Sequence, residues 1–457
     1  MSKLLEVYKK IPAGPRAWLK QGYSLIPLSW RLGPRFFRDL RFFEHSQWWP
    51  PERLRDYQNQ CLHALIEHAY EQVPYYRELM DSKGLTPAHF QTVDDLSKLP
   101  ILKKETVRAD SEKFRARNFD DSQVVKVSTS GTTGEPLHMV FDRRQEYLNY
   151  DPYIWRFFGW GGHTPGQPRA TLSRWTVHGR LPYQFNPVRS QLQLSAYDLN
   201  VNTAVEYRKA MKQYRIEYMD GYPASIELLT KYLKSQNRQP PVQLKAIFTH
   251  SECLFPWMRR VIEEYWGCKC FDWYGLEERA VLGVECDHHE GLHLCPDFGV
   301  TEFVADSDGQ KRIIATGFLN VAMPLIRYDT EDFGELVDGG CSCGRKGFPL
   351  FRLVGGRQRI FALGKDGTRI PLTNFDVDHA VDHILQLQFI QNQPGELHLL
   401  LVRAPDFNER DIITIRRNLE ERFRDNMDLQ IHFTDQIERN PSGKTSIFIQ
   451  NIGRVTE

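Results

Sequence analysis

Residues 202–273 alternate between helical and strand patterns, and this alternation constrains the fold more than any other feature of the sequence. Helices are expected over residues 202–215, 224–234 and 256–266, and strands around Tyr218 and over residues 243–249 and 269–273. Strands that alternate with helices form a parallel α/β sheet, and ligands gather beyond the carboxyl ends of such strands. Residues 222–223, 250–252 and 274–275 follow the strands, so we expect them to converge on one edge of the sheet.

The segments before and after this region have different patterns. Apolar residues recur with a helical period over residues 51–80, where Val73-Pro74 is expected to end or kink the helix. We therefore expect residues 1–120 to be largely helical. After Glu302 the sequence changes to short strands separated by turn residues, including residues 313–316 and 325–328, which predicts a β-rich subdomain.

The C-terminal part of the chain predicts a separate, small α+β unit. Residues 397–403 and 429–433 have strand patterns, and residues 408–424 have the pattern of a helix with Asn408 as its N-cap. The expected organisation is a large N-terminal domain, residues 1–356, and a small, mobile C-terminal domain, residues 357–457.

Charge balance and cysteine content narrow the class of protein. The 457 residues include 59 basic and 58 acidic side chains, and such a neutral chain gives no electrostatic reason to expect a nucleic-acid partner. The apolar runs within residues 1–25 are too short for a signal or membrane segment. Eight cysteines are too few for a disulfide scaffold in a chain of this length. We expect a cytoplasmic protein without a transmembrane segment, and the sequence carries no signal of its oligomeric state.

Residues 128–136, Ser-Thr-Ser-Gly-Thr-Thr-Gly-Glu-Pro, have the composition of a phosphate-binding loop. Hydroxyl side chains supply donors, and the glycines allow the backbone to turn around phosphate oxygens. Residues 123–127 and 137–141 have strand patterns, so the loop is expected to connect two strands. A serine-rich surface turn would have the same composition, and the remaining motifs have to decide between the two interpretations.

Four residues form a candidate zinc site. Three thiolates and an imidazole make a soft, tetrahedral ligand set that suits Zn²⁺, and they come from Cys286, His293, Cys341 and Cys343. With all four ligands from the protein the ion would be structural, because no coordination position stays open. Competing ligands lie close along the chain, namely Cys295, His288 and His289, and reduced thiols without a metal are the alternative.

Five motifs in order along nearly the whole chain resemble those of the adenylate-forming enzymes, within the phenylacetate-CoA ligase-like branch that includes CapK-type capsule proteins. They are the loop at 128–136, Tyr-Gly-Leu-Glu-Glu at 274–278, Ile-Arg-Tyr-Asp-Thr-Glu-Asp at 326–332, Gly-Arg at 356–357 and Asn-Pro-Ser-Gly-Lys at 440–444. Val-Pro-Tyr-Tyr-Arg at 73–77 is also similar to a segment of this branch. The resemblance implies the fold of an adenylate-forming ligase, with ATP and Mg²⁺ as cofactors.

The resemblance also implies a role for each site residue. Glu278 would bind Mg²⁺, Asp332 would accept hydrogen bonds from the ribose, and Arg357 would help to hold the nucleotide. Lys444 would bridge the substrate carboxylate and the α-phosphate, and the small domain would then rotate for a second half-reaction. The ATP-binding residues that the match implies are Ser128, Thr129, Ser130, Gly131, Thr132, Thr133, Gly134, Ser251, Glu252, Tyr274, Gly275, Asp332 and Arg357.

An ATP-dependent carboxylate ligase is the function that the resemblance implies. Such an enzyme forms an acyl-adenylate, releases pyrophosphate and transfers the acyl group to a thiol, for which coenzyme A is the expected acceptor. Amide formation on an amino acceptor, in polysaccharide or secondary-metabolite biosynthesis, stays open as the alternative. Aromatic residues between 153 and 183 suit an aryl acid, and core packing explains them equally well.

Three residues depart from the family pattern and keep other hypotheses open. Glu277 replaces Thr or Ser, Glu331 replaces Gly, and Arg359 stands where an acidic residue or Lys is usual. A nucleotide-binding scaffold without turnover is therefore a further hypothesis, and a zinc-dependent binding module is a weaker one. A Walker A loop ending at Lys444 is disfavoured, because it requires glycine where Glu438 stands.

Overall fold

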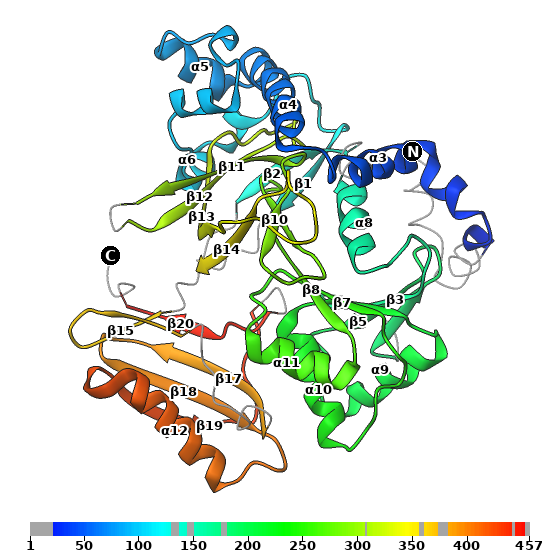
Figure 1. The fold of residues 1–457 in the computed structure, drawn as a ribbon, viewed down its shortest axis with the longest axis vertical. Helices are drawn as coiled ribbons and strands as arrows, with labels where there is room; N and C mark the ends of the chain where they lie inside the picture. The colour runs from blue at the N-terminus through cyan, green and yellow to red at the C-terminus, as the bar shows by residue number, and fades with distance from the viewer. Residues whose placement is uncertain are drawn as a thin grey trace.

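The computed structural model describes residues 22–128, 137–143, 150–174, 181–306, 309–355, 361–372, 383–440 and 444–452. Figure 1 shows a helical N-terminal part in blue, a large sheet with its helices in cyan to yellow, and a C-terminal unit in orange and red. Among the described helices, none is both long enough and apolar enough to span a membrane.

The N-terminal part is helical, as expected. Its α-helices are α3 (Leu28–Ser46), α4 (Pro51–Gln72), α5 (Pro74–Ser82) and α6 (Lys104–Ala109), and short 3-10 helices follow α5 and α6. The predicted break is confirmed: Val73 is extended (φ −107°, ψ 112°), and α5 begins at Pro74 because proline at the first helical position sacrifices no hydrogen bond. The buried faces of α4 and α5 pack against later parts of the chain that include Met323 and Leu325.

The large domain is built on one twelve-stranded sheet in the order β11-β12-β13-β14-β10-β9-β8-β7-β6-β3-β5-β4. Strands β5, β3, β6, β7 and β8 are parallel to one another, which confirms the α/β prediction. The strands of this part are β3 (Arg169–Ser173), β5 (Gln191–Ser195), β6 (Tyr218–Gly221), β7 (Ala246–His250) and β8 (Lys269–Gly275), with β4 (Tyr183–Asn186) antiparallel at the edge.

Helices cover both faces of the parallel part. They are α8 (Tyr150–Trp160), α9 (Val201–Gln213), α10 (Pro223–Ser235) and α11 (Pro256–Trp266). Because successive strand residues point to opposite faces, Phe248 packs with Phe157 of α8, whereas Ile247 packs with residues of α9 to α11. The parallel strands are therefore apolar on both faces, and polar chemistry is confined mainly to their ends.

The antiparallel half of the sheet continues from β8. Its strands are β9 (Leu282–Glu285), β10 (Leu292–Leu294), β11 (Gly299–Ala305), β12 (Lys311–Gly317), β13 (Tyr328–Leu336) and β14 (Leu350–Gly355). The strand expected over residues 325–328 is misplaced, because only Tyr328 lies in a strand, as the first residue of β13. The preceding Arg327 has φ +52°, a left-handed conformation that interrupts the extended backbone before β13.

The segments next to the candidate phosphate loop are strands, as predicted. β1 (Val124–Ser128) pairs antiparallel with β2 (His138–Asp142), and Ser128 lies opposite His138. The loop residues 129–136 themselves lie outside the described residues. The pairing brings the two ends of the loop together at one end of a short hairpin.

The C-terminal unit has the predicted α+β character. A four-stranded sheet in the order β19-β18-β17-β20 packs with one helix, and a small hairpin precedes it. The elements are β15 (Phe361–Leu363), β16 (Arg369–Pro371), β17 (Ile384–Gln391), β18 (Glu396–Arg403), α12 (Glu409–Phe423), β19 (Asp428–Phe433) and β20 (Phe448–Gln450). Asn408 caps α12 as expected, since its Oδ1 accepts the Arg410 N–H at 3.0 Å.

Candidate active site and metal cluster

The carboxyl ends of β5, β6 and β7 meet the C-terminal unit. The Lys444 ammonium donates to the backbone oxygen of Ser251 at 3.0 Å and lies 5.6 Å from the ring centre of Tyr222. Arg439, from the same C-terminal segment, donates to the backbone oxygen of Ala196 just beyond β5. The predicted catalytic lysine therefore reaches the sheet edge at which ligands were expected.

Glu252 lies next to this contact. Its Oε2 accepts the backbone N–H of Ala224, in the first turn of α10, at 3.4 Å. Burial raises the pKa of Glu252 to about 7, and the charges of Lys444 and Arg439 oppose that rise. The carboxylate is therefore placed to attract the cations of the C-terminal segment.

Tyr274 and Asp332 come together although 58 residues separate them. The Tyr274 hydroxyl donates to Asp332 Oδ2 at 2.8 Å, and Asp332 is only 5% exposed. The Asp332 N–H in turn donates to the Thr330 hydroxyl at 3.1 Å. These contacts hold the carboxylate in one orientation, next to the end of β8, where the backbone of Gly275 is exposed.

Glu278 is buried in a polar cluster that also contains a lysine. The carboxylate is 2% exposed, accepts the Tyr328 hydroxyl at 2.9 Å and lies 3.9 Å from the ammonium of Lys104. The same ammonium lies 3.9 Å from Glu331. Lys104 was missed in the sequence, because nothing there distinguishes it from the adjacent Lys103.

The structure shows the surroundings of two of the three residues that differ from the family pattern, Glu331 and Glu277. Glu331 has φ +64°, a left-handed conformation that costs a residue with a Cβ about 1–2 kcal/mol and that glycine adopts freely. Its carboxylate compensates by facing the buried Lys104. Glu277 is exposed, so it does not crowd the Glu278 carboxylate inside the cluster. Arg359 lies outside the described residues.

Arg327, in the motif at 326–332, has a supporting position. It forms a bidentate pair with Glu302 at 3.0 and 2.8 Å and also donates to the backbone oxygen of Leu99. It therefore ties the antiparallel half of the sheet to the N-terminal helical part.

Several predicted nucleotide-binding residues cannot be placed. Thr129, Ser130, Gly131, Thr132, Thr133, Gly134 and Arg357 lie outside the described residues. Ser128, at the end of β1, is exposed, and its hydroxyl lies 2.9 Å from His138 Nδ1. Their roles in binding ATP stay predictions.

The aromatic residues of α8 are mainly part of the core. Tyr153, Phe157 and Phe158 are 2%, 1% and 6% exposed, respectively. Phe157 stacks on Trp273 with ring centres 5.8 Å apart, and Tyr153 stacks on Phe43 at 3.8 Å. Core packing thus accounts for them, and they provide no argument for an aryl acid.

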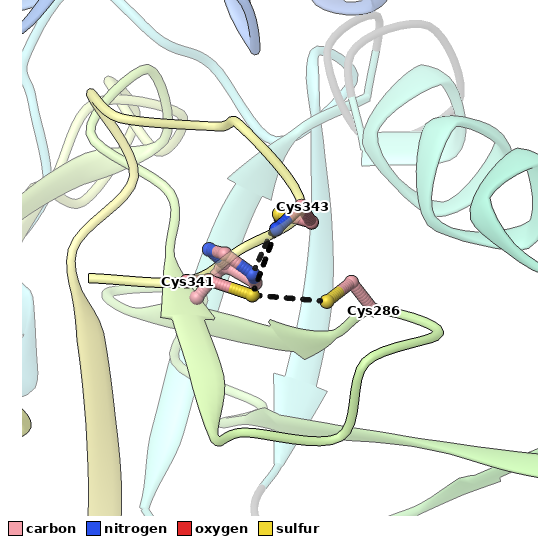
Figure 2. Close-up of side chains that lie close together, drawn as sticks. Cys286, Cys341 and Cys343 are labelled. Atoms are coloured by element: carbon pink, nitrogen blue, oxygen red, sulfur yellow. Dashed lines mark hydrogen bonds between the residues drawn. The ribbon is translucent and has the colours of Figure 1, made fainter.

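The four predicted zinc ligands lie together, although 57 residues separate the first from the last (Figure 2). One ligand atom from each residue falls within 4.8 Å of the others. The sulfurs of Cys286 and Cys341 are 3.6 Å apart, and Cys343 Sγ is 3.5 Å from His293 Nε2. The set has the size and the ligand types of a tetrahedral zinc site.

Contacts around the cluster distinguish these ligands from their competitors. His293 Nδ1 lies 3.0 Å from the Phe348 backbone oxygen, an arrangement in which Nδ1 carries the proton and Nε2 is left for a metal. His288 instead lies 2.7 Å from the Ser342 hydroxyl, and His289 pairs with Glu285 at 3.2 Å. Cys295 Sγ points toward the backbone oxygen of His293 at 3.9 Å.

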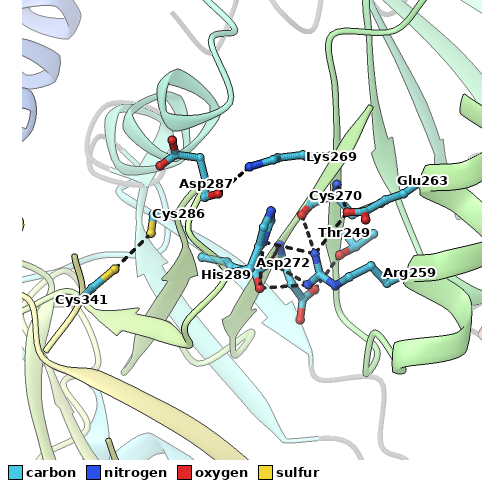
Figure 3. Close-up of polar contacts among 11 residues, drawn as sticks. Thr249, Arg259, Glu263, Lys269, Cys270, Asp272, Cys286, Asp287, His289 and Cys341 are labelled. Carbon is cyan, nitrogen blue, oxygen red and sulfur yellow. Dashed lines mark hydrogen bonds and ion pairs between the residues drawn. The ribbon is translucent and has the colours of Figure 1, made fainter. Parts of the chain in front are cut away.

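A polar network connects the metal cluster with β8 (Figure 3). Glu285, which precedes Cys286, binds Arg259 of α11 in a bidentate pair at 2.9 and 2.8 Å. It also accepts the backbone N–H of Asp272 at 2.9 Å. Burial raises the pKa of Asp272 to about 7, although the Thr249 hydroxyl donates to it at 2.6 Å. Cys286 thus lies next in the chain to a residue of the network that holds β8 (Lys269–Gly275).

The fold of this chain is similar to that of solved CoA ligases. The crystal structure of 2-hydroxyisobutyryl-CoA ligase in the postadenylation state aligns with a TM-score of 0.71 and 15% identity, over 90% of this chain and 92% of that chain. The same ligase in the thioesterification state aligns with a TM-score of 0.58 at 17% identity, over the same shares of the two chains.

The sequence relatives include CapK and phenylacetate-CoA ligases. The chain is 25% identical over 417 residues to protein CapK of Staphylococcus aureus, which covers 87% of this chain and 90% of CapK. It is 28% identical over 318 residues to phenylacetate-coenzyme A ligase of Thermus thermophilus, over 65% of this chain and 68% of the ligase. Residues 363–451 match the sequence model of the CapK C-terminal domain.

Proposed function

We propose that this protein is an ATP-dependent carboxylate ligase that forms an acyl-adenylate, releases pyrophosphate and transfers the acyl group to coenzyme A. The contact of Lys444 with the backbone oxygen of Ser251 carries this proposal. It brings a cation from the C-terminal unit to the sheet edge where Tyr274 and Asp332 lie, in a chain whose relatives include phenylacetate-CoA ligases. The nearly neutral charge of the chain agrees with small-molecule substrates.

Lys444 and the nucleotide-binding residues have complementary roles in the proposal. Attack of a carboxylate on the α-phosphate builds negative charge on the phosphoryl oxygens, which the Lys444 ammonium offsets. Asp332, oriented by Tyr274, accepts hydrogen bonds from the ribose. The hydroxyls and amides of residues 128–134 hold the departing pyrophosphate, and Arg357 contacts the nucleotide at a hinge near residue 357.

The cluster around Glu278 fits a divalent cation. Two carboxylates, Glu278 and Glu331, lie 3.9 Å from one ammonium, that of Lys104. A carboxylate is the ligand type that Mg²⁺ prefers, and Tyr328 fixes its orientation. Bound Mg²⁺ would neutralise charge on the phosphates. Lys104 limits the repulsion between the two carboxylates and the incoming triphosphate.

An amine is the second candidate acceptor. The relationship to CapK extends over 87% of the chain, whereas the phenylacetate-CoA ligase match extends over 65%. The CapK match also includes the C-terminal unit, residues 363–451, which carries Lys444. Amide formation on an amino acceptor is therefore the alternative to transfer to coenzyme A.

We also propose that Cys286, His293, Cys341 and Cys343 bind one structural Zn²⁺. The spacing of their ligand atoms and the Phe348 contact of His293 support this assignment. The ion would connect the end of β9 to the turn that precedes β14, away from the reacting groups. We place the protein in the cytoplasm, where ATP and coenzyme A are available.

The proposal is tested by acid-dependent exchange of labelled pyrophosphate into ATP, because exchange reports adenylation without the acceptor. The assay uses Mg²⁺ and a panel of aryl, fatty, amino and hydroxy acids. We expect exchange with at least one acid, and its loss in Lys444→Ala with ATP affinity largely retained. Full activity of Lys444→Ala would remove that lysine from the mechanism. ATP binding without pyrophosphate exchange for any acid would favour the scaffold hypothesis. If exchange is observed, adding coenzyme A or amines to the active enzyme identifies the acceptor.

A further inference from the structure

Arg439 makes the second contact between the C-terminal segment and the sheet edge. Its guanidinium donates to the backbone oxygen of Ala196, 243 residues earlier in the chain. Arg439 is half-buried, and burial lowers its pKa, while the nearby Tyr232, Glu252 and Tyr207 oppose that shift. A cation in such a place needs partners, and these partners belong to the large domain.

Arg439 and Lys444 are coupled through the backbone. The Asn440 N–H donates to the Lys444 backbone oxygen at 2.9 Å, and the Lys444 N–H donates to Asn440 Oδ1 at 3.0 Å. These two bonds hold Lys444 against Asn440, the residue next to Arg439. A constraint on the Arg439 side chain therefore restricts the position of the Lys444 ammonium.

Glu252 interacts with both cations of the C-terminal segment, Arg439 and Lys444. Its carboxylate interacts electrostatically with Lys444 and Arg439, and it also accepts the backbone N–H of Thr445. Glu252 itself belongs to the large domain, where it accepts the Ala224 N–H at the start of α10. The sequence predicted Glu252 as an ATP-binding residue. In the structure Glu252 also has partners in the C-terminal unit.

We propose that Arg439 is a positioning residue that latches the C-terminal unit, through Ala196 and Glu252, in the orientation where Lys444 reaches the sheet edge. The proposal rests on the proposed ligase function, because the latch acts on adenylation alone. Once the unit rotates for the transfer step, Arg439 and Lys444 leave the edge together, since the bonds between Asn440 and Lys444 link them. The latch thus stabilises one of the two working orientations.

The test compares Arg439→Met with Arg417→Met, a matched change at an arginine of α12 whose side chain is 62% exposed. For Arg439→Met we expect pyrophosphate exchange to fall at least tenfold, which corresponds to about 1.4 kcal/mol, and Arg417→Met to leave it unchanged. Transfer from a supplied acyl-adenylate to coenzyme A, or to the amine acceptor, is expected to be unchanged or faster. Arg439→Lys, which keeps the charge, recovers part of the exchange rate. An equal fall in both half-reactions would overturn the latch.

Hydrogen exchange separates failure of the latch from failure of the ligase function. Backbone amides of residues 250–254, which include the Ser251 and Glu252 contacts of the C-terminal segment, are expected to exchange faster in Arg439→Met, while those of β11 stay unchanged. Unchanged hydrogen exchange of the amides of residues 250–254 would refute the latch, whatever the rate of pyrophosphate exchange. A different result is possible if the wild-type protein adenylates no acid. Faster hydrogen exchange at residues 250–254 in Arg439→Met would then support the latch, while the absent adenylation would refute the ligase function. A uniform increase over the whole chain would show a merely structural role.

Discussion

Removing the Tyr328 hydroxyl tests whether Glu278 acts as a metal ligand. The hydroxyl donates to Glu278 Oε1 at 2.9 Å, and the carboxylate is only 2% exposed, so water does not readily replace a lost donor. The bond is present without the metal, so only the part of its energy that orients the carboxylate toward Mg²⁺ is lost from binding. A hydrogen bond to a charged group contributes about 1.5–3 kcal/mol, which sets an upper bound of roughly 10- to 100-fold. In Tyr328→Phe we therefore expect the Mg²⁺ concentration for half-maximal pyrophosphate exchange to rise measurably and by no more than that factor.

The control for this change is Tyr153→Phe. Tyr153 is 2% exposed, and its hydroxyl donates to the backbone oxygen of Asp297, away from the carboxylate cluster. Both variants are expected to lose about 1–2 kcal/mol of unfolding free energy and to melt a few degrees lower, because each removes a buried hydrogen bond. Only Tyr328→Phe is expected to change the Mg²⁺ dependence. An active Tyr328→Phe enzyme with the wild-type Mg²⁺ dependence would refute the assignment of Glu278 to the metal.

Three further predictions concern the metal cluster, a buried carboxyl and a supporting arginine. Cys343→Ser is expected to lose one equivalent of zinc and about 3 kcal/mol of unfolding free energy, while Cys268→Ser keeps its zinc; elemental analysis and thermal unfolding measure both. Asp272 has a folded-state pKa raised from 3.8 to about 7, so its ionisation opposes folding increasingly as the pH rises through that window. Asp272→Asn should therefore be stabilising by about 2 kcal/mol at pH 8 and by much less at pH 4; an equal effect at both would contradict the shift. Arg327→Met leaves Glu302 partly buried without its partner, so urea unfolding should show a loss of about 3 kcal/mol, with an unchanged KM for ATP in the folded enzyme.

Much of the fold was predictable, because local patterns report the periodicity of the backbone. The helix over residues 256–266 begins and ends where the sequence predicts, since Pro256 starts it and Gly267 ends it with φ +66°. The strand expected over residues 325–328 was misplaced, because the left-handed backbone of Arg327 is not encoded in its apolar neighbours, and β13 begins only at Tyr328. Side-chain patterns predict which face is buried and do not report single backbone angles of this kind.

The candidate site was predictable to the extent that its residues lie in contiguous motifs. Tyr274, Glu278, Asp332 and Lys444 were predicted in that way. Lys104 and Arg439 were not, because their importance comes from what they contact: Lys104 faces Glu278 and Glu331, and Arg439 reaches Ala196. The residues next to Lys104 and Arg439 in the sequence do not predict either contact.

The sequence by itself determined the α/β class, the C-terminal unit and the residue types of both candidate sites. Only the tertiary structure decided which side chains meet: Tyr274 with Asp332, His293 with Cys343 rather than His288, and Arg439 with the large domain. The physical reason is that a motif specifies chemistry within a few residues, where backbone geometry is local. Contacts across 50 to more than 200 residues depend on strand order, on register and on how the C-terminal unit docks, and these follow from the burial of apolar surface over the whole chain.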